Sequence, residues 1–145
     1  MARWIGLDLG MARTGIAVTD RDAMIASPLE TVATKDLLSR LQALVNEESC
    51  AGFVVGDPGP LADSAPLIAQ WEQRLKKAFP GKTIRKVDES FSSREARSAM
   101  VAGGMKKSRR QEKGAMDRVA AAIILQRFLE EQESGDRPGF PGFLG

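Results

Sequence analysis

Carboxylates end several segments whose other residues are apolar, and they are the side chains in this sequence best suited to chemistry. They are Asp8, Asp57, Asp88, Glu89 and Asp117. Acids that face inward without basic partners repel one another, and burying them uncompensated is costly. A bound divalent cation removes both penalties. Two such ions, held ~3.5–4 Å apart by carboxylates, activate a water and stabilise the leaving oxygen in phosphodiester hydrolysis.

The composition excludes most other hydrolytic chemistry. The 145-residue chain contains no histidine, which removes Ser-His-Asp and Cys-His triads, histidine-ligated metals and an imidazole base. Its one cysteine, Cys50, cannot form an intrachain disulfide or a zinc site that needs paired cysteines. Any hydrolysis must therefore rely on carboxylates, with a hard metal ion bound through oxygen.

A basic segment, GMKKSRRQEKG at 104–114, directly precedes the last acid. Its positive residues are Lys106, Lys107, Arg109, Arg110 and Lys113. Such charge runs are usually solvated, mobile loops. Beside an acidic metal site, however, this one suits a polyanionic substrate, whose phosphates would neutralise the cations and release counterions. The net charge of +2 does not indicate nucleic acid by itself.

Periodicity predicts an α/β domain around these acids. Apolar runs at 3–9 and 14–19, joined by GMARTG, predict a β-hairpin. The other predicted elements are a strand at about 29–33, a helix capped by Thr34, a strand at 52–57, a helix opened by Pro66, a strand at 83–89, a helix over 92–103 and a last helix over about 115–133. Helical crossovers between strands imply parallel neighbours. We therefore expect a five-stranded mixed sheet, with an antiparallel hairpin and third strand plus two parallel strands, and helices on both faces.

The length and the 43% hydrophobic content predict one domain over 1–133, followed by a flexible Gly/Pro-rich tail over 134–145. No stretch is long and apolar enough to span a membrane, and the N-terminus lacks the pattern of a signal peptide. We expect a soluble, cytoplasmic protein that does not bind membranes.

The parallel strands of such a sheet end at one edge, where sites form. Asp8, Asp57 and the neighbours Asp88 and Glu89 each end such a strand, so we expect them to gather there. Asp20 ends an antiparallel strand, and roughly five or six residues at ~3.3 Å each carry it to the opposite edge.

Asp117 is expected to face inward from the last helix. It shares one helical stripe with Ala121, Ile124 and Phe128, and that stripe is apolar. The small residues 120–122 would let this helix approach the sheet closely.

Each acid also has a structural interpretation. Asp8 is read equally well as a strand-end residue bonded to the hairpin amides, and Asp57, before Pro58, as a turn former. Asp117 is read as a helix cap or as a partner of the helix dipole. Glu89 is read as a solvated loop acid. Convergence of four acids on one edge is what favours a site.

Four segments together resemble one known family. They are GLDLGMARTGIAVTD at 6–20, VVGDP at 54–58, VDESFSS at 87–93 and MDRVAAAIILQRFL at 116–129. In this order they are similar to the YqgF/RuvX family, the bacterial Holliday-junction-resolvase-like proteins of the ribonuclease H superfamily. The resemblance covers most of residues 4–130 and implies a ribonuclease H-like fold.

The resemblance also implies a nuclease that depends on Mg²⁺ or Mn²⁺, with two ions. The three acidic positions of the family fall on Asp8, Glu89 and Asp117, with Asp8 bridging both ions. Arg13 matches an arginine that would lie near a bound phosphate. Attack by water in line would leave 5′-phosphate and 3′-hydroxyl ends.

The sequence departs from the family in two places. Ser90 stands where the family usually has arginine, and Arg94, about one turn into the next helix, is a candidate replacement. Asp57 adds an acid to the family's Gly-Leu-Pro, which makes it a candidate auxiliary metal ligand.

The substrate class stays open at this point. The family is linked both to processing the 5′ end of pre-16S ribosomal RNA and to cleaving branched DNA. A homodimer would favour branched DNA, because junction cleavage needs two sites related by a two-fold axis, whereas a monomer would favour RNA trimming.

Two other functions compete with the nuclease. One is a non-catalytic nucleic-acid-binding module in transcription or ribosome assembly, against which the set of acids argues. The other is an actin-like kinase, suggested by DLGMARTG at 8–15, although such proteins need two domains to enclose a nucleotide.

Overall fold

The computed structural model describes residues 2–20, 25–59, 61–88 and 115–135. Its elements are β1 (Arg3–Asp8), β2 (Arg13–Thr19), β3 (Ala26–Ala33), the 3-10 turn η1 (Thr34–Asp36), α1 (Leu37–Glu47), β4 (Cys50–Asp57), α2 (Ala65–Ala78), β5 (Thr83–Asp88) and α5 (Ala115–Gly135). The predicted helix at 92–103 and most of the predicted tail lie outside the described residues. Within them, no helix has the length and apolar character needed to cross a membrane.

The strands form one five-stranded mixed sheet in the order β3-β2-β1-β4-β5. β1 is antiparallel to β2 and parallel to β4, while β4 is parallel to β5 and β2 antiparallel to β3. This confirms the predicted sheet. β3 begins three residues earlier than expected, at Ala26, because its pairing with β2 continues past Pro28 to the end of the hairpin. Proline is tolerated there because β3 is an edge strand.

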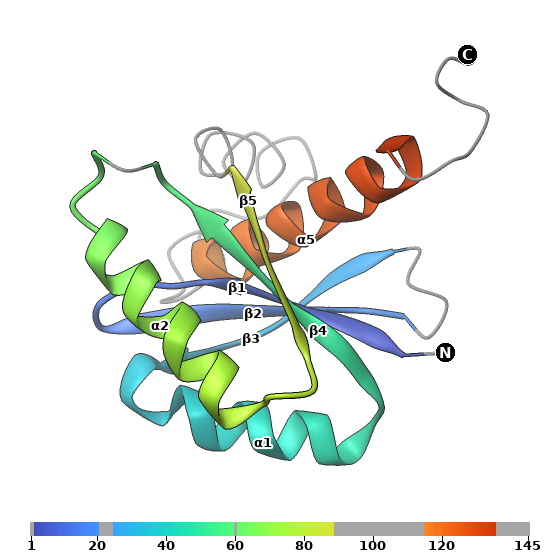
Figure 1. The fold of residues 1–145 in the computed structure, drawn as a ribbon, viewed down its shortest axis with the longest axis horizontal. Helices are drawn as coiled ribbons and strands as arrows, with labels where there is room; N and C mark the ends of the chain where they lie inside the picture. Colours follow the sequence, from blue (N-terminus) through green and yellow to red (C-terminus); the bar gives the residue numbers. More distant parts are fainter. Residues whose placement is uncertain (1, 21–24, 60, 89–114, 136–145) are drawn as a thin grey trace.

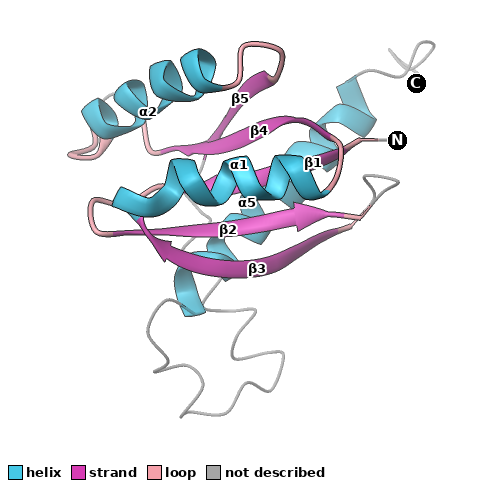
Figure 2. Cartoon of the chain, turned by 90° about the horizontal axis from the view of Figure 1, so that it is seen from below, coloured by secondary structure: helices cyan, strands magenta, loops and turns pink. Residues whose placement is uncertain are grey.

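Helices cover both faces of the sheet, as predicted: α1 and α2 lie on one side and α5 on the other (Figures 1 and 2). The core under α1 and α2 includes Ile5, Leu7, Ile16, Phe53, Val55, Leu41 and Trp71. The core under α5 includes Ala17, Val54, Val87, Ala121, Ile124, Leu125 and Phe128. Successive strand residues alternate between the two cores, so the face of each strand residue follows from its position.

Glycines on the strands, together with the alanines of α5, set how closely that helix approaches the sheet. A Cβ atom added to Gly15 would overlap the backbone oxygen of Asp117, and one added to Gly6 would lie 2.8 Å from Leu125 Cβ. Residues 120–122 are buried, as expected. The backbone of α5 therefore rests directly on β1 and β2.

Thr34 does not cap α1, so that prediction is wrong. Its hydroxyl donates to the carbonyl oxygen of Gly10 at 2.7 Å and lies 2.9 Å from Thr14 Oγ1. Because the single hydroxyl proton of Thr34 goes to Gly10, Thr14 must donate to Thr34. Both threonines are buried, and the backbone N–H of Thr34 also donates to Ala12 at 2.9 Å. The pair fastens the β1–β2 turn to the end of β3.

Replacing Thr34 with valine should lower the free energy of unfolding by about 1–3 kcal/mol, because Gly10 and Thr14 would lose a buried partner without gaining water. Thr34→Ser keeps the hydroxyl and should lose distinctly less. Denaturant unfolding of both variants checks this. Equal losses in the two would mean that the methyl packing, and not the hydroxyl, is what matters.

Candidate functional site

Asp8 ends β1 on the face that α5 covers. Alternation along β1 places it with Trp4, whose ring lies 4.7 Å from that of Phe128 on α5, and with Gly6, which faces Leu125. Its partner across β2 is Gly15. The side chain of Asp8 therefore belongs to the α5 side of the sheet, at the edge where the parallel strands end.

Asp117 is brought to the same place from the other end of the sequence. It lies in the first turn of α5, and its backbone oxygen packs on Gly15, the strand partner of Asp8. The predicted inward stripe is confirmed, since Ala121, Ile124 and Phe128 are all buried. Through Gly15, the fold places the two acids on one face of one sheet edge.

Arg13 joins this pair of acids. Its Nε donates to Oδ2 of Asp117 at 2.9 Å, and the side chains of Arg13 and Asp117 are 44% and 24% exposed. The expectation that the inward acids lack a basic partner is therefore wrong for Asp117. Arg13 opens β2 on the same face as Gly15, and only the crossing of α5 over β2 brings the two partners, 104 residues apart, together.

Asp57 and Asp88 reach the same edge but not the same face. They are register partners at the ends of β4 and β5. Phe53 and Val55 belong to the core under α1 and α2, and alternation places Asp57 with them. On β5, the Nζ of Lys86 lies 3.6 Å from Oε1 of Glu72 on α2, so Lys86 points to the α2 side. Asp88, two residues further along the strand, shares that side. Both acids thus belong to the face opposite Asp8.

The carboxylate of Asp57 also has a structural task. Its Oδ1 accepts a hydrogen bond from the backbone N–H of Gly59 at 3.0 Å, and Gly59 has a φ of 97°, which favours glycine. The turn interpretation accounts for Asp57 without a metal.

Asp57→Asn should therefore leave metal affinity and cleavage within about two-fold of the wild type, because an asparagine oxygen accepts the same bond in the turn. Calorimetric titration with Mn²⁺ and a cleavage assay check this. A marked loss of Mn²⁺ affinity in Asp57→Asn would instead establish Asp57 as the auxiliary ligand predicted from its strand-end position.

Asp20 lies at the opposite edge, as predicted. It follows β2, and its Oδ1 accepts a hydrogen bond at 3.4 Å from the N–H of Ile25, the residue just before β3. Its position at the turn between these strands separates it from Asp8 by the length of the hairpin.

The remaining predicted site residues lie outside the described residues. They are Glu89, Arg94, Lys106, Lys107, Arg109, Arg110 and Lys113. Within the described ranges, no group of three or more acids, cysteines or histidines is placed to hold a metal ion. Asp8 and Asp117 supply hard oxygen donors, the type that Mg²⁺ and Mn²⁺ prefer, so the donor chemistry fits such an ion. Hard divalent cations of this kind are commonly held by one or two carboxylates together with water and substrate phosphate.

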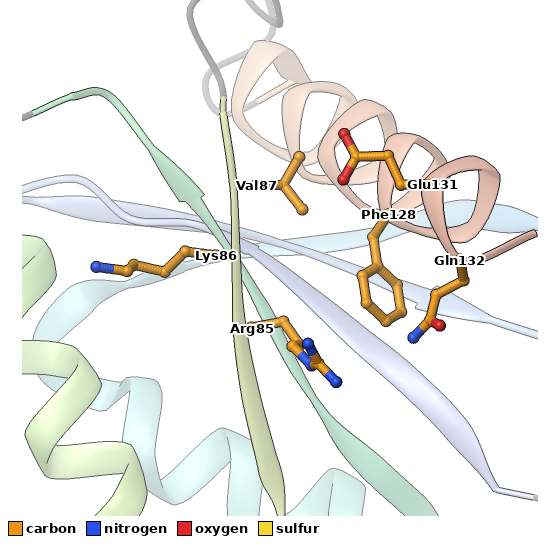
Figure 3. Close-up of a pocket in the computed structure, with 6 residues that line it drawn as sticks. All are labelled: Arg85, Lys86, Val87, Phe128, Glu131 and Gln132. Atoms are coloured by element: carbon orange, nitrogen blue, oxygen red, sulfur yellow. The ribbon is translucent and has the colours of Figure 1, made fainter. Parts of the chain in front are cut away.

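Two hollows lie near these elements. One is lined by Ala12, residues 31–33 and Arg13, the partner of Asp117. The other lies between β5 and α5, and Figure 3 shows Arg85, Phe128 and Gln132 in its lining. Neither hollow could be predicted from local pattern, because the residues that line each one come from separate elements.

Comparisons with known proteins agree with this architecture. The family model described as "RuvX: Holliday junction resolvase" matches residues 2–131. A protein of Amoebophilus asiaticus named as a candidate pre-16S rRNA nuclease is 41% identical over 133 residues, which is 89% of this chain and 94% of the relative. A protein of Christiangramia forsetii with the same name is 40% identical, over 90% of this chain and 100% of its own.

Solved structures of low sequence identity share the fold. RuvC of Thermus thermophilus, in complex with a Holliday junction substrate, superposes with a TM-score of 0.58 at 16% identity, over 92% of this chain and 96% of its own. The fowlpox virus resolvase in complex with Holliday junction DNA gives a TM-score of 0.58 at 11% identity, over 89% and 97%. These likenesses establish a shared fold.

Proposed function

Since this chain belongs to the RuvX family, we propose that it is a nuclease that hydrolyses phosphodiester bonds in structured nucleic acid. One observation carries the proposal. Asp8 and Asp117 lie on one face of the sheet, at the edge where the parallel strands end, because the backbone of Asp117 contacts Gly15, the strand partner of Asp8. A module that only binds nucleic acid has no reason to collect carboxylates where a phosphate must lie.

Asp8 and Asp117, together with Glu89, would hold the Mg²⁺ or Mn²⁺ that the proposed chemistry needs. Glu89 directly follows Asp88, the last residue of β5, in the sequence. When bound, the ions supply the positive charge that activates a water for in-line attack and stabilises the leaving oxygen.

The protein itself contributes rigidity and charge to this site. Asp8 ends a central strand that is paired on both sides, and Asp117 lies on a helix whose backbone touches that sheet. Such positions hold acids in a fixed geometry, which reduces the entropic cost of orienting the reactants. Arg13 places a positive charge at the same edge, where it suits a phosphate of the substrate.

Binding of the polyanionic substrate would extend to residues outside the described ranges. Arg94 and the basic segment are the candidates, since the basic segment leads directly into α5 and the helix acid Asp117. Their contribution is sequence-independent attraction to phosphates, which weakens with salt.

The names of the relatives suggest a precursor of 16S rRNA as substrate, and the structural neighbours suggest branched DNA. A cleavage assay with Mn²⁺ should compare a structured ribosomal RNA leader, a four-way DNA junction and a linear DNA duplex. We expect cleavage of the structured substrates in preference to the duplex. Binding without cleavage of any of them would replace the nuclease with a nucleic-acid-binding module.

The oligomeric state belongs to the same experiment. A homodimer in solution would support paired cuts in a junction, because two sites related by a two-fold axis can act on opposite strands. Sedimentation of the assayed sample provides this measurement. A monomer that trims only the RNA leader would favour the ribosomal substrate.

A further inference from the structure

Arg13 and a divalent cation would compete for one carboxylate. The guanidinium Nε lies 2.9 Å from Oδ2 of Asp117, an oxygen of a proposed metal ligand. We propose that Arg13 is a positioning residue that holds Asp117 until a divalent cation displaces it, and that the freed guanidinium then turns toward a phosphate of the substrate. This inference rests on the proposed function and adds to it an order of events at the site.

The exposure of the pair allows such an exchange. Both side chains remain in partial contact with water, Arg13 at 44% and Asp117 at 24%. Exposed ion pairs of this kind contribute little net free energy, because water competes for both partners. A divalent cation that Asp117 shares with other carboxylates gains from several charges at once, so it can outcompete a single guanidinium.

Hydrogen bonds hold the backbone on both sides of Arg13 in place. The proposed movement away from Asp117 is therefore a movement of the Arg13 side chain alone. Thr14, the next residue, is fully buried and donates to Thr34, which in turn donates to Gly10 on the other side of Arg13. Arg13 is itself one of the residues that line the hollow formed with Ala12 and residues 31–33. Released from Asp117, the side chain of Arg13 has open space at the same sheet edge.

The consequence is a coupling between cation and substrate. Without a divalent cation, Asp117 neutralises Arg13, and the edge presents less positive charge to a phosphate. With the cation bound, the guanidinium becomes available to the substrate. Coupling of this kind is reciprocal, so a nucleic acid that engages Arg13 should in turn raise the affinity of the site for the cation.

A matched ion pair provides the control for this exchange. Arg40 on α1 holds Glu30 on β3 through two bonds, Nε and Nη2 each at 2.8 Å from a carboxylate oxygen. Its bond to α1 places this pair on the face of the sheet opposite α5, whereas Asp117 lies on α5, so we expect Mg²⁺ bound to Asp117 to leave it undisturbed.

The test is nuclear magnetic resonance of the arginine Nε–H groups in ¹⁵N-labelled protein, titrated with Mg²⁺ whose affinity is measured separately by calorimetry. The Arg13 signal is assigned by its loss in Arg13→Lys. We expect this signal to shift during the titration, with a midpoint at the Mg²⁺ concentration that calorimetry gives, while the Arg40 signal stays unchanged. Asp117→Asn should place the Arg13 signal at its released position without Mg²⁺. An unchanged Arg13 signal at saturating Mg²⁺ would overturn the exchange.

A second measurement, the Mg²⁺ affinity of Arg13→Gln, distinguishes the exchange from a permanent support of Asp117 by Arg13. The two interpretations predict changes of affinity in opposite directions. If Arg13 competes with the cation, Arg13→Gln should bind Mg²⁺ about two- to five-fold more tightly, the range expected from an exposed ion pair. Weaker Mg²⁺ binding in Arg13→Gln would show instead that Arg13 orients Asp117 as a ligand, and would overturn the proposal.

The two proposals can fail separately. Metal-dependent cleavage with an unmoved Arg13 signal overturns the exchange and leaves the nuclease intact. Absence of both Mg²⁺ binding and metal-dependent cleavage overturns both.

Discussion

Asp8→Asn should lower the rate of nucleic-acid cleavage on the order of 10³-fold or more, with little change in fold. The amide keeps the shape of the side chain at the end of β1 but removes the negative charge on which the proposed site depends. Single-turnover cleavage with Mn²⁺ measures the rate, and thermal unfolding by circular dichroism verifies the fold. Nucleic-acid binding should persist, since it depends on basic residues.

Asp20→Asn is the matched control, because it makes the same chemical change at the opposite edge of the same hairpin. Its cleavage rate should stay within about two-fold of the wild type, as is usual for a surface substitution away from a site. Full activity in Asp8→Asn would remove Asp8 from the mechanism, whatever the behaviour of Asp20→Asn.

Gly15→Ala should impair both stability and cleavage, because α5 rests on Gly15. A methyl group there would overlap the backbone oxygen of Asp117. Because β2 lies in the interior of the sheet, α5 must move away from it to make room. Overpacking of this kind costs about 1–3 kcal/mol. The shift moves Asp117 away from Asp8, and a displacement of about 1 Å at a reacting centre can cost roughly 10²-fold in rate.

The measurement pairs denaturant unfolding with cleavage under conditions where the variant is fully folded. Gly6→Ala is the comparison, since its Cβ would meet Leu125 and Ala121 about one to two turns further along α5, at 2.8 and 2.9 Å. It should lose stability but keep more activity. If Gly15→Ala cleaved as well as Gly6→Ala, the contact between Gly15 and Asp117 would not be what positions the acid.

Local pattern was sufficient to predict the order of the elements that the structure describes, the edge position of Asp8 and the inward face of Asp117. Asp8 followed from a strand-end position, and Asp117 from the 3.6-residue period it shares with Ala121 and Phe128. Each of these two patterns lies within a single element, β1 for Asp8 and α5 for Asp117. The prediction that Thr34 caps α1 was wrong because the hydroxyl of Thr34 bonds to Gly10, 24 residues away in the sequence. A local capping pattern cannot reveal such a tertiary partner.

The pairing of Arg13 with Asp117 could not be predicted, since it depends on how α5 crosses β2. The face of Asp57 relative to Asp8 could not be predicted from β4 alone. The two-residue period places Asp57 on the same side as Phe53 and Val55, but β4 is apolar on both faces, and only its register with β1 shows that this side is opposite Asp8. Asp8, Asp57 and Asp88 do end their strands at one edge, as predicted, but the face within that edge also decides which acids can share a metal ion.

The most direct test of a carboxylate metal site at this edge is anomalous diffraction from crystals of the protein soaked in Mn²⁺. The site described above predicts anomalous density in direct contact with the carboxylates of both Asp8 and Asp117. Manganese bound elsewhere, with neither acid among its ligands in a protein that cleaves nucleic acid, would contradict it.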